Sequence, residues 1–148
     1  MDAKSSYRET AVRGANTGQL VILLYEQAIE DLRRARVAVE KRDIRARTRE
    51  INHALDVINH LQGSLDMERG GEVARNLQRF YNMLRGGLVE AHTQQSARIL
   101  EEQIAHLVLL HGAWLEVERA TSARETGAAE AGSASTRRSG NPVTEWNA

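Results

Sequence analysis

The stretch from Leu20 to Glu118 contains no proline, because the only proline of the chain is Pro142. It is rich in Leu, Ala, Glu, Arg and Gln, whose side chains lose little freedom in a helix. This composition predicts an all-α fold. Since single domains usually have roughly 100 to 150 residues, a chain of 148 residues should form one domain with terminal extensions.

Apolar residues recur three and four positions apart in four segments of this stretch, the spacing that places them on one face of a helix. The inward stripes begin at Val21, Ile44, Val73 and Leu100. We expect helices over about 17–42, 44–67, 72–91 and 96–119. Because the connections between them have about two to eight residues, successive helices should run antiparallel and close as an up-down four-helix bundle.

Capping residues and glycines mark the ends of these helices. Asp43 is placed to accept a hydrogen bond from a free amide in the first turn of the second helix. Gly70 with Gly71 ends that helix. The pair Gly86-Gly87 lies inside the third helix, where each glycine costs about 0.5 to 1 kcal/mol relative to alanine. That pair therefore predicts a kink or a close contact.

The composition changes at both ends of the bundle. From residue 121 onward Ala, Gly, Ser, Thr and Glu predominate without apolar periodicity, so we expect a disordered tail over 121–148. Residues 1–16 form an N-terminal arm, with Tyr7 and Val12 as its sizeable apolar groups. Such an arm is either loose or docked by those two side chains. The bundle itself should occupy 17–120.

Charge, hydropathy and cysteine content exclude several classes of function. The 20 Lys and Arg residues balance the 20 Asp and Glu residues, so the whole molecule has no long-range attraction for nucleic acid or anionic lipid. No apolar run approaches the roughly 18 residues that cross a bilayer, and the first residues lack the apolar core of a signal peptide. We therefore expect a cytoplasmic protein without stable membrane insertion. Without cysteine there is no disulfide and no thiolate metal site.

A catalytic or metal site would need converging polar groups. Glu50 and His53 form Glu-x-x-His, but a di-iron bundle requires a second such pair, which this sequence lacks. His111 falls on the core spacing of the fourth helix, where a buried, hydrogen-bonded histidine is expected. No nucleophile elbow, phosphate-binding glycine loop or His-Glu-x-x-His motif occurs. We expect no catalytic residue, metal or cofactor, and a metal-dependent enzyme using Glu50 and His53 stays an alternative.

The start of the first helix carries more apolar surface than one core face requires. At about 100° per residue, Val21 and Tyr25 lie on the core seam, whereas Leu23 points nearly opposite. Large exposed apolar patches usually mark binding surfaces. Periodicity alone leaves three occupants open, namely a partner helix, the N-terminal arm, or a second copy of the chain. The candidate partner-binding residues are Tyr7, Val12, Leu20, Ile22, Leu23, Tyr25 and Ile29.

Several short strings occur along the chain in a characteristic order. They are Tyr7 followed by Val12, Thr17-Gly18-Gln19-Leu20, Leu24-Tyr25-Glu26, Phe80-Tyr81-Asn82-Met83-Leu84, Leu88-Val89-Glu90-Ala91 and Ala113-Trp114. In this order and spacing they resemble the flagellin export chaperones of the FliS family, over roughly residues 7–119. The sequence departs from that family at Gly86-Gly87, at Asn16-Thr17-Gly18 and in the tail after Arg119.

The resemblance implies an antiparallel helical bundle that binds the C-terminal region of newly made flagellin in the cytoplasm. It further implies that the protein prevents premature filament assembly and presents flagellin to the flagellar type III export gate. In the family the N-terminal arm, anchored by its tyrosine, can lie over the client groove, which would give Tyr7 that role here. The rival hypothesis is a self-associating structural bundle that uses the same apolar patch as a homodimer interface.

Overall fold

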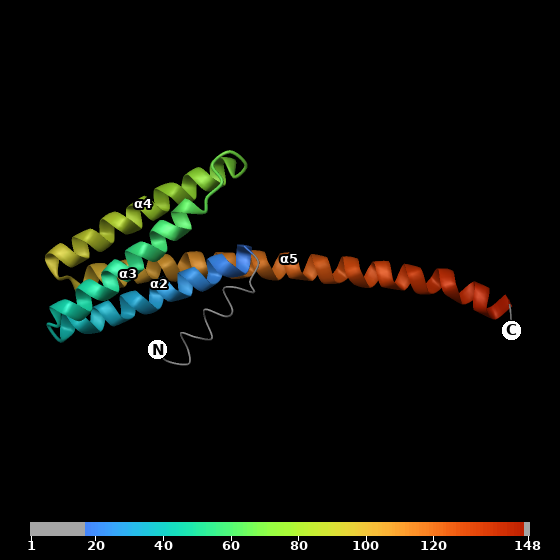
Figure 1. Cartoon of the computed structure of the whole chain (residues 1–148), viewed down its shortest axis with the longest axis horizontal. Helices are drawn as coiled ribbons and strands as arrows, with labels where there is room; N and C mark the ends of the chain where they lie inside the picture. The colour runs from blue at the N-terminus through green and yellow to red at the C-terminus, as the bar shows by residue number, and fades with distance from the viewer. Residues whose placement is uncertain (1–16, 147–148) are drawn as a thin grey trace. The chain divides into compact units, whose positions relative to one another are not determined.

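The computed structural model describes the backbone of residues 17–146 and the side chains of residues 18–127. Four helices follow one another in the described residues, and no strand occurs there (Figure 1). They are α2 (Thr17–Glu40), α3 (Ile44–Gly63), α4 (Gly71–Gln94) and α5 (Ala97–Trp146). The chain divides into two compact units, Met1–Trp114 and Leu115–Ala148. The predicted all-α four-helix bundle is confirmed, and it lies within the first unit.

The turns between the helices combine predicted caps with left-handed backbone. Asp43 caps α3 as predicted, since its side chain accepts a hydrogen bond from the Ala46 amide at 3.0 Å. α3 ends at Gly63, earlier than the predicted end near residue 67. Gly71 instead begins α4, and its φ of 54° belongs to the left-handed region that glycine tolerates best. The glycine pair therefore marks the start of the next helix as well as the end of a turn.

Buried side chains from all four helices form one hydrophobic core, which follows the predicted stripes. Its fully buried members include Leu32 and Ala35 of α2, Ile51 and Ile58 of α3, Leu84 and Leu88 of α4, and Leu100 and Leu107 of α5. Two predicted core positions are wrong. Ile44 is 61% exposed and Val73 is 67% exposed. Each lies in the first turn of its helix, and helical periodicity does not establish that another helix covers a side chain in that turn.

The fourth helix is longer than predicted. We expected it to end near Arg119, whereas α5 extends as far as Trp146. The side chains of residues 119–127 are all exposed. Ala, Glu and Arg, which occur among residues 119–127, favour a helix locally, and no side chain of these residues is buried. The missing apolar periodicity correctly indicated that residues 121–127 contribute none to a core.

The two glycines inside α4 have different surroundings. A Cβ atom at Gly87 would collide with the side-chain amide of Gln103 from α5, and Gln103 is itself buried. A Cβ atom at Gly86 would meet nothing within 4 Å. The sequence predicted either a kink or a close contact at this glycine pair, and the close contact occurs at Gly87. Gly86 has no such contact among the described residues.

Replacing these two glycines by alanine should change stability in opposite directions. Gly86→Ala should raise the free energy of unfolding by about 0.5 to 1 kcal/mol, because it only improves helix propensity. Gly87→Ala should lower it by about 1 kcal/mol, because the buried Gln103 amide must move. Urea unfolding followed by circular dichroism measures both. Equal effects of the two substitutions would contradict the contact between α4 and α5 at Gly87.

Candidate partner-binding surface at the start of α2

Five of the seven predicted partner-binding residues lie on the first four turns of α2. The other two, Tyr7 and Val12, lie outside the described residues. The structure separates the five into two groups according to whether their side chains belong to the hydrophobic core. This separation decides which of them can meet a partner without disturbing the fold.

Tyr25 and Ile29 belong to the core. Tyr25 is 0% exposed and Ile29 is 7% exposed, and both are members of the buried cluster. The prediction that Ile29 exceeds what the bundle can hide is therefore wrong. Its side chain lies one helical turn after Tyr25 on the same inward side, so the bundle covers it. Neither residue offers a free surface in this structure.

Tyr25 connects three helices through its phenol oxygen. This oxygen is hydrogen-bonded to the Tyr81 hydroxyl of α4, and it accepts a hydrogen bond from Trp114 Nε1 of α5 at 3.1 Å. Burial raises the pKa of both Tyr25 and Tyr81 above the ordinary value of a tyrosine. Both phenols therefore remain protonated at neutral pH, and one can donate to the other. The Tyr25 hydroxyl is thus a structural junction beneath the start of α2.

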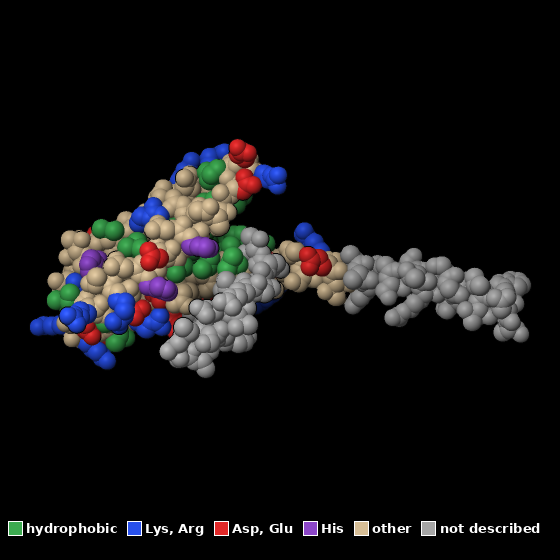
Figure 2. Space-filling model, in the orientation of Figure 1, with side chains coloured by type: hydrophobic (Ala, Val, Ile, Leu, Met, Phe, Trp, Pro, Cys, Tyr) green, Lys and Arg blue, Asp and Glu red, His purple; other side chains and the backbone are tan. Residues whose placement is uncertain are grey.

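Leu20 and Leu23 do not belong to the core. Leu20 and Leu23 are half-buried, and neither is among the partly buried residues that pack against the core cluster. Ile22 is only 8% exposed, so it is covered about as fully as Ile29, although it is not a member of that cluster. The prediction that Ile22 exceeds what the bundle can hide is therefore wrong as well. Figure 2 shows hydrophobic side chains at the surface beside the start of α2. We call Leu20 and Leu23 the α2 apolar surface.

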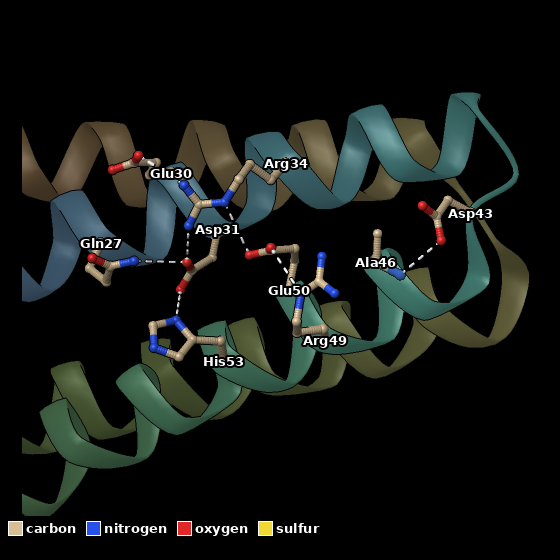
Figure 3. A network of polar contacts seen from close by, with 9 residues as sticks. All are labelled: Gln27, Glu30, Asp31, Arg34, Asp43, Ala46, Arg49, Glu50 and His53. Atoms are coloured by element: carbon tan, nitrogen blue, oxygen red, sulfur yellow. Dashed lines mark hydrogen bonds and ion pairs between the residues drawn. The ribbon is translucent and has the colours of Figure 1, made fainter. Parts of the chain in front are cut away.

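A network of charged side chains follows this surface along α2 (Figure 3). The Asp31 carboxylate is fully buried, and it accepts hydrogen bonds from Gln27 at 2.8 Å, Arg34 at 2.8 Å and His53 Nδ1 at 2.5 Å. Arg34 also donates to Glu50 at 3.2 Å. Because His53 and Glu50 belong to α3, the network joins α2 to α3 beyond their apolar contact.

His53 belongs to the alternative of a metal-dependent enzyme, and His111 was expected in the core; both have other surroundings in the structure. Glu50 and His53 contact Arg34 and Asp31 respectively, and no group of three His, Asp or Glu side chains in the described part is placed to hold a metal ion. His111 was expected to be hydrogen-bonded. It is instead partly buried, and its Nε2 atom lies 3.9 Å from Glu26 Oε1 without a hydrogen-bond partner. That distance is too long for a hydrogen bond.

The protonation of Asp31 should affect stability with a defined sign. Burial raises the pKa of this carboxyl above its ordinary value, although the His53 and Gln27 hydrogen bonds and the Arg34 charge act in the opposite direction. The folded state therefore binds a proton at a pH where the unfolded state has already released it. The Asp31 carboxyl therefore stabilises the folded state fully when the pH is below the pKa that it has in the unfolded protein. This stabilisation is lost as the pH rises through the higher pKa that it has in the folded protein.

An Asp31→Asn variant removes that dependence. The free energy of unfolding of the unmodified protein, relative to the variant, should increase as the pH falls from neutrality toward about pH 4. Urea unfolding of both proteins across this range measures the difference. A difference that stays constant, or that grows as the pH rises, would contradict the assignment of Asp31 as a buried carboxyl with a raised pKa.

Exposed apolar side chains also occur where the sequence analysis did not look for them. On α5, Val108 and Leu109 are exposed, Leu109 by 77%, and on α4 Met83 and Val89 are exposed. The signal for the first pair was present in the sequence, because residues 107–110 are apolar without interruption and a single core face uses only part of such a run. Among the described residues, none of the helices is long and apolar enough to cross a membrane.

Comparison with known proteins decides the family. The family model described as flagellar protein FliS matches residues 1–121. The chain belongs to the FliS family. It is 35% identical over 118 residues to the flagellar secretion chaperone FliSB of Pseudomonas aeruginosa, covering 77% of this chain and 94% of that protein. It is 33% identical over 119 residues to the flagellar secretion chaperone FliS of Salmonella typhimurium, covering 80% and 88% of the two chains.

This result confirms the family resemblance inferred from the short sequence strings. The FliS match covers the predicted N-terminal arm and the whole bundle, and it ends close to residue 119, from which the described side chains of α5 are exposed. A flagellar export chaperone is thereby supported for the bundle. Residues 122–148 lie outside the matched region.

Proposed function

We propose that this protein binds the C-terminal region of newly made flagellin in the cytoplasm. Binding would keep the flagellin from polymerising prematurely and would present it to the flagellar type III export gate. The protein acts by holding its client, and no catalytic step is involved. Family membership supports the chaperone role.

The observation that carries this proposal is the position of the α2 apolar surface outside the hydrophobic core. Leu20 and Leu23 are partly exposed and are not among the residues of the core cluster or those packed against it, so a partner can contact them while the bundle remains folded. An amphipathic helix laid against such a surface is a common mode of recognition. The N-terminal arm, through Tyr7 and Val12, would compete with the client for the same surface.

Co-purification tests the proposal against its rival. This protein and a tagged segment from the C-terminal region of flagellin should co-elute in size-exclusion chromatography, and deletion of residues 1–16 should preserve or strengthen the complex. Sedimentation of the protein alone separates the alternatives. A tight homodimer without affinity for flagellin would favour the self-associating structural bundle, and a large loss of affinity on deletion would make the arm part of the binding surface.

A further inference from the structure

A second polar cluster lies between α3 and α4, and its centre is Arg85. The Arg85 guanidinium donates Nη2 hydrogen bonds to Asn59 Oδ1 at 2.5 Å and to Gln62 Oε1. It donates from Nη1 to Asn82 Oδ1 at 3.3 Å, and Gln62 Nε2 also donates to Asn82 Oδ1 at 2.9 Å. We call Asn59, Gln62, Asn82 and Arg85 the Arg85 site. Side chains from two helices therefore hold one partly buried cation in place.

The partners of Arg85 differ from those of the arginines that join other helices. Arg34 has ion pairs with Glu30, Asp31 and Glu50, and Arg36 has ion pairs with Glu40 and Glu101. Arg85 has only amide oxygens as acceptors, and no carboxylate of the described residues lies within 4 Å of it. Amide oxygens orient a guanidinium but do not neutralise its charge. The positive charge of Arg85 is therefore fixed in position and uncompensated.

The hydrogen-bond inventory of the site favours an anionic ligand. Three of the five N–H groups that a guanidinium carries donate within the site, which leaves the Nε–H and one Nη1–H of Arg85 for a further acceptor. The amide nitrogens of Asn59 and Asn82 make no hydrogen bond among the described residues and can also donate. Arginine with amide donors is a common arrangement for binding carboxylates.

The surroundings favour a peptide over a free ion. Val89 lies one helical turn after Arg85 on α4, and its side chain is exposed. It could contact the apolar part of a bound segment while the guanidinium binds the acidic group. We infer that the Arg85 site binds a carboxylate of the flagellin client, at a place separate from the α2 apolar surface. This inference rests on the proposed function, because it takes flagellin as the partner.

Affinity measurements on Arg85 variants test this inference. The probe is the flagellin C-terminal segment, titrated by calorimetry into the unmodified protein and into Arg85→Gln. Loss of a charge-assisted hydrogen bond should weaken binding by about 10- to 100-fold. Arg85→Lys should recover little of this, because a lysine does not present the planar fork of a guanidinium. The salt dependence of the affinity should also decrease in Arg85→Gln.

Arg79→Gln is the matched control, since Arg79 lies on the same helix and, among the described residues, its side chain is hydrogen-bonded only to Asn76, three positions earlier. Its affinity should stay within about threefold of the unmodified protein. Two sets of client segments then identify the source of the carboxylate. One set has the C-terminal carboxylate converted to an amide, and the other has single Asp→Asn or Glu→Gln changes. The carboxylate that binds the Arg85 site is the one whose removal weakens binding to the unmodified protein but does not weaken binding to Arg85→Gln any further.

Specific outcomes would overturn the inference. The Arg85→Gln protein could be folded and bind as tightly as the unmodified protein, or lose no more affinity than Arg79→Gln. Either result would show that the Arg85 site does not bind the client, and it would leave the chaperone proposal intact. A change in oligomeric state of Arg85→Gln, seen by sedimentation without client, would assign the site to self-association instead. Unmodified protein that does not bind flagellin at all overturns the proposed function, and this inference with it.

Discussion

Replacing Tyr25 by alanine should lower the free energy of unfolding by about 3 to 5 kcal/mol, the range for removing a large buried aromatic side chain. The Tyr25 ring is fully buried, and its centroid lies 6.4 Å from that of Tyr81. Its hydroxyl is the shared hydrogen-bond partner of Tyr81 and Trp114. The substitution would therefore leave a cavity and two polar groups without their partner, where three helices meet. Urea unfolding followed by circular dichroism measures the loss.

Tyr25→Phe separates the hydroxyl from the ring. It keeps the packing and removes only the hydrogen bonds, so we expect a smaller loss of about 1 to 3 kcal/mol. Tyr81→Phe should be milder than Tyr25→Phe, because the bond between Trp114 and Tyr25 remains. If Tyr25→Phe were as stable as the unmodified protein, the Tyr25 hydroxyl would not be the junction between α2, α4 and α5.

The bundle was predictable because its core stripes repeat at helical spacing. Leu32 and Ala35 of α2, and Leu100 and Leu107 of α5, are buried as their spacing indicates. Periodicity gives the direction in which each side chain points from its own helix. It does not say whether a neighbouring helix lies beside that position along the helix axis. Ile44 and Val73 have the right angle and lie in first turns, so they remain exposed.

The candidate surface was only partly predictable for the same reason. Ile22 and Ile29 lie on the same side of α2, and periodicity alone treats them alike. In the structure both are buried, Ile22 at 8% and Ile29 at 7% exposed, whereas Leu20 and Leu23 stay partly exposed. Which of these side chains is covered depends on what packs against each turn of α2, which requires the tertiary structure.

Polar contacts between distant residues were not predictable. The Tyr25–Tyr81 hydrogen bond joins residues 56 positions apart, and the Trp114–Tyr25 bond joins residues 89 positions apart. The sequence pattern places His53 only in a Glu-x-x-His motif with Glu50, yet His53 contacts Asp31 across α2 and α3. No local pattern specifies such a pairing, because it depends on the register between two helices.

Replacing Leu23 by aspartate should weaken flagellin binding by about 10- to 100-fold, because it would place an unpaired carboxylate against the apolar face of the client. The protein should remain folded, because Leu23 is half-buried and is not among the residues that pack against the core cluster. Val37→Asp is the matched control. Val37 is a partly exposed apolar residue on the same helix, four turns after Leu23, and its substitution should leave the affinity nearly unchanged.

Calorimetric titration of the flagellin C-terminal segment into the folded, unmodified protein is the most direct test of the chaperone account. The account predicts saturable binding that Leu23→Asp weakens strongly and Val37→Asp does not. The absence of binding to the unmodified protein, or equal affinity of Leu23→Asp in its folded form, would contradict the claim that the start of α2 receives flagellin.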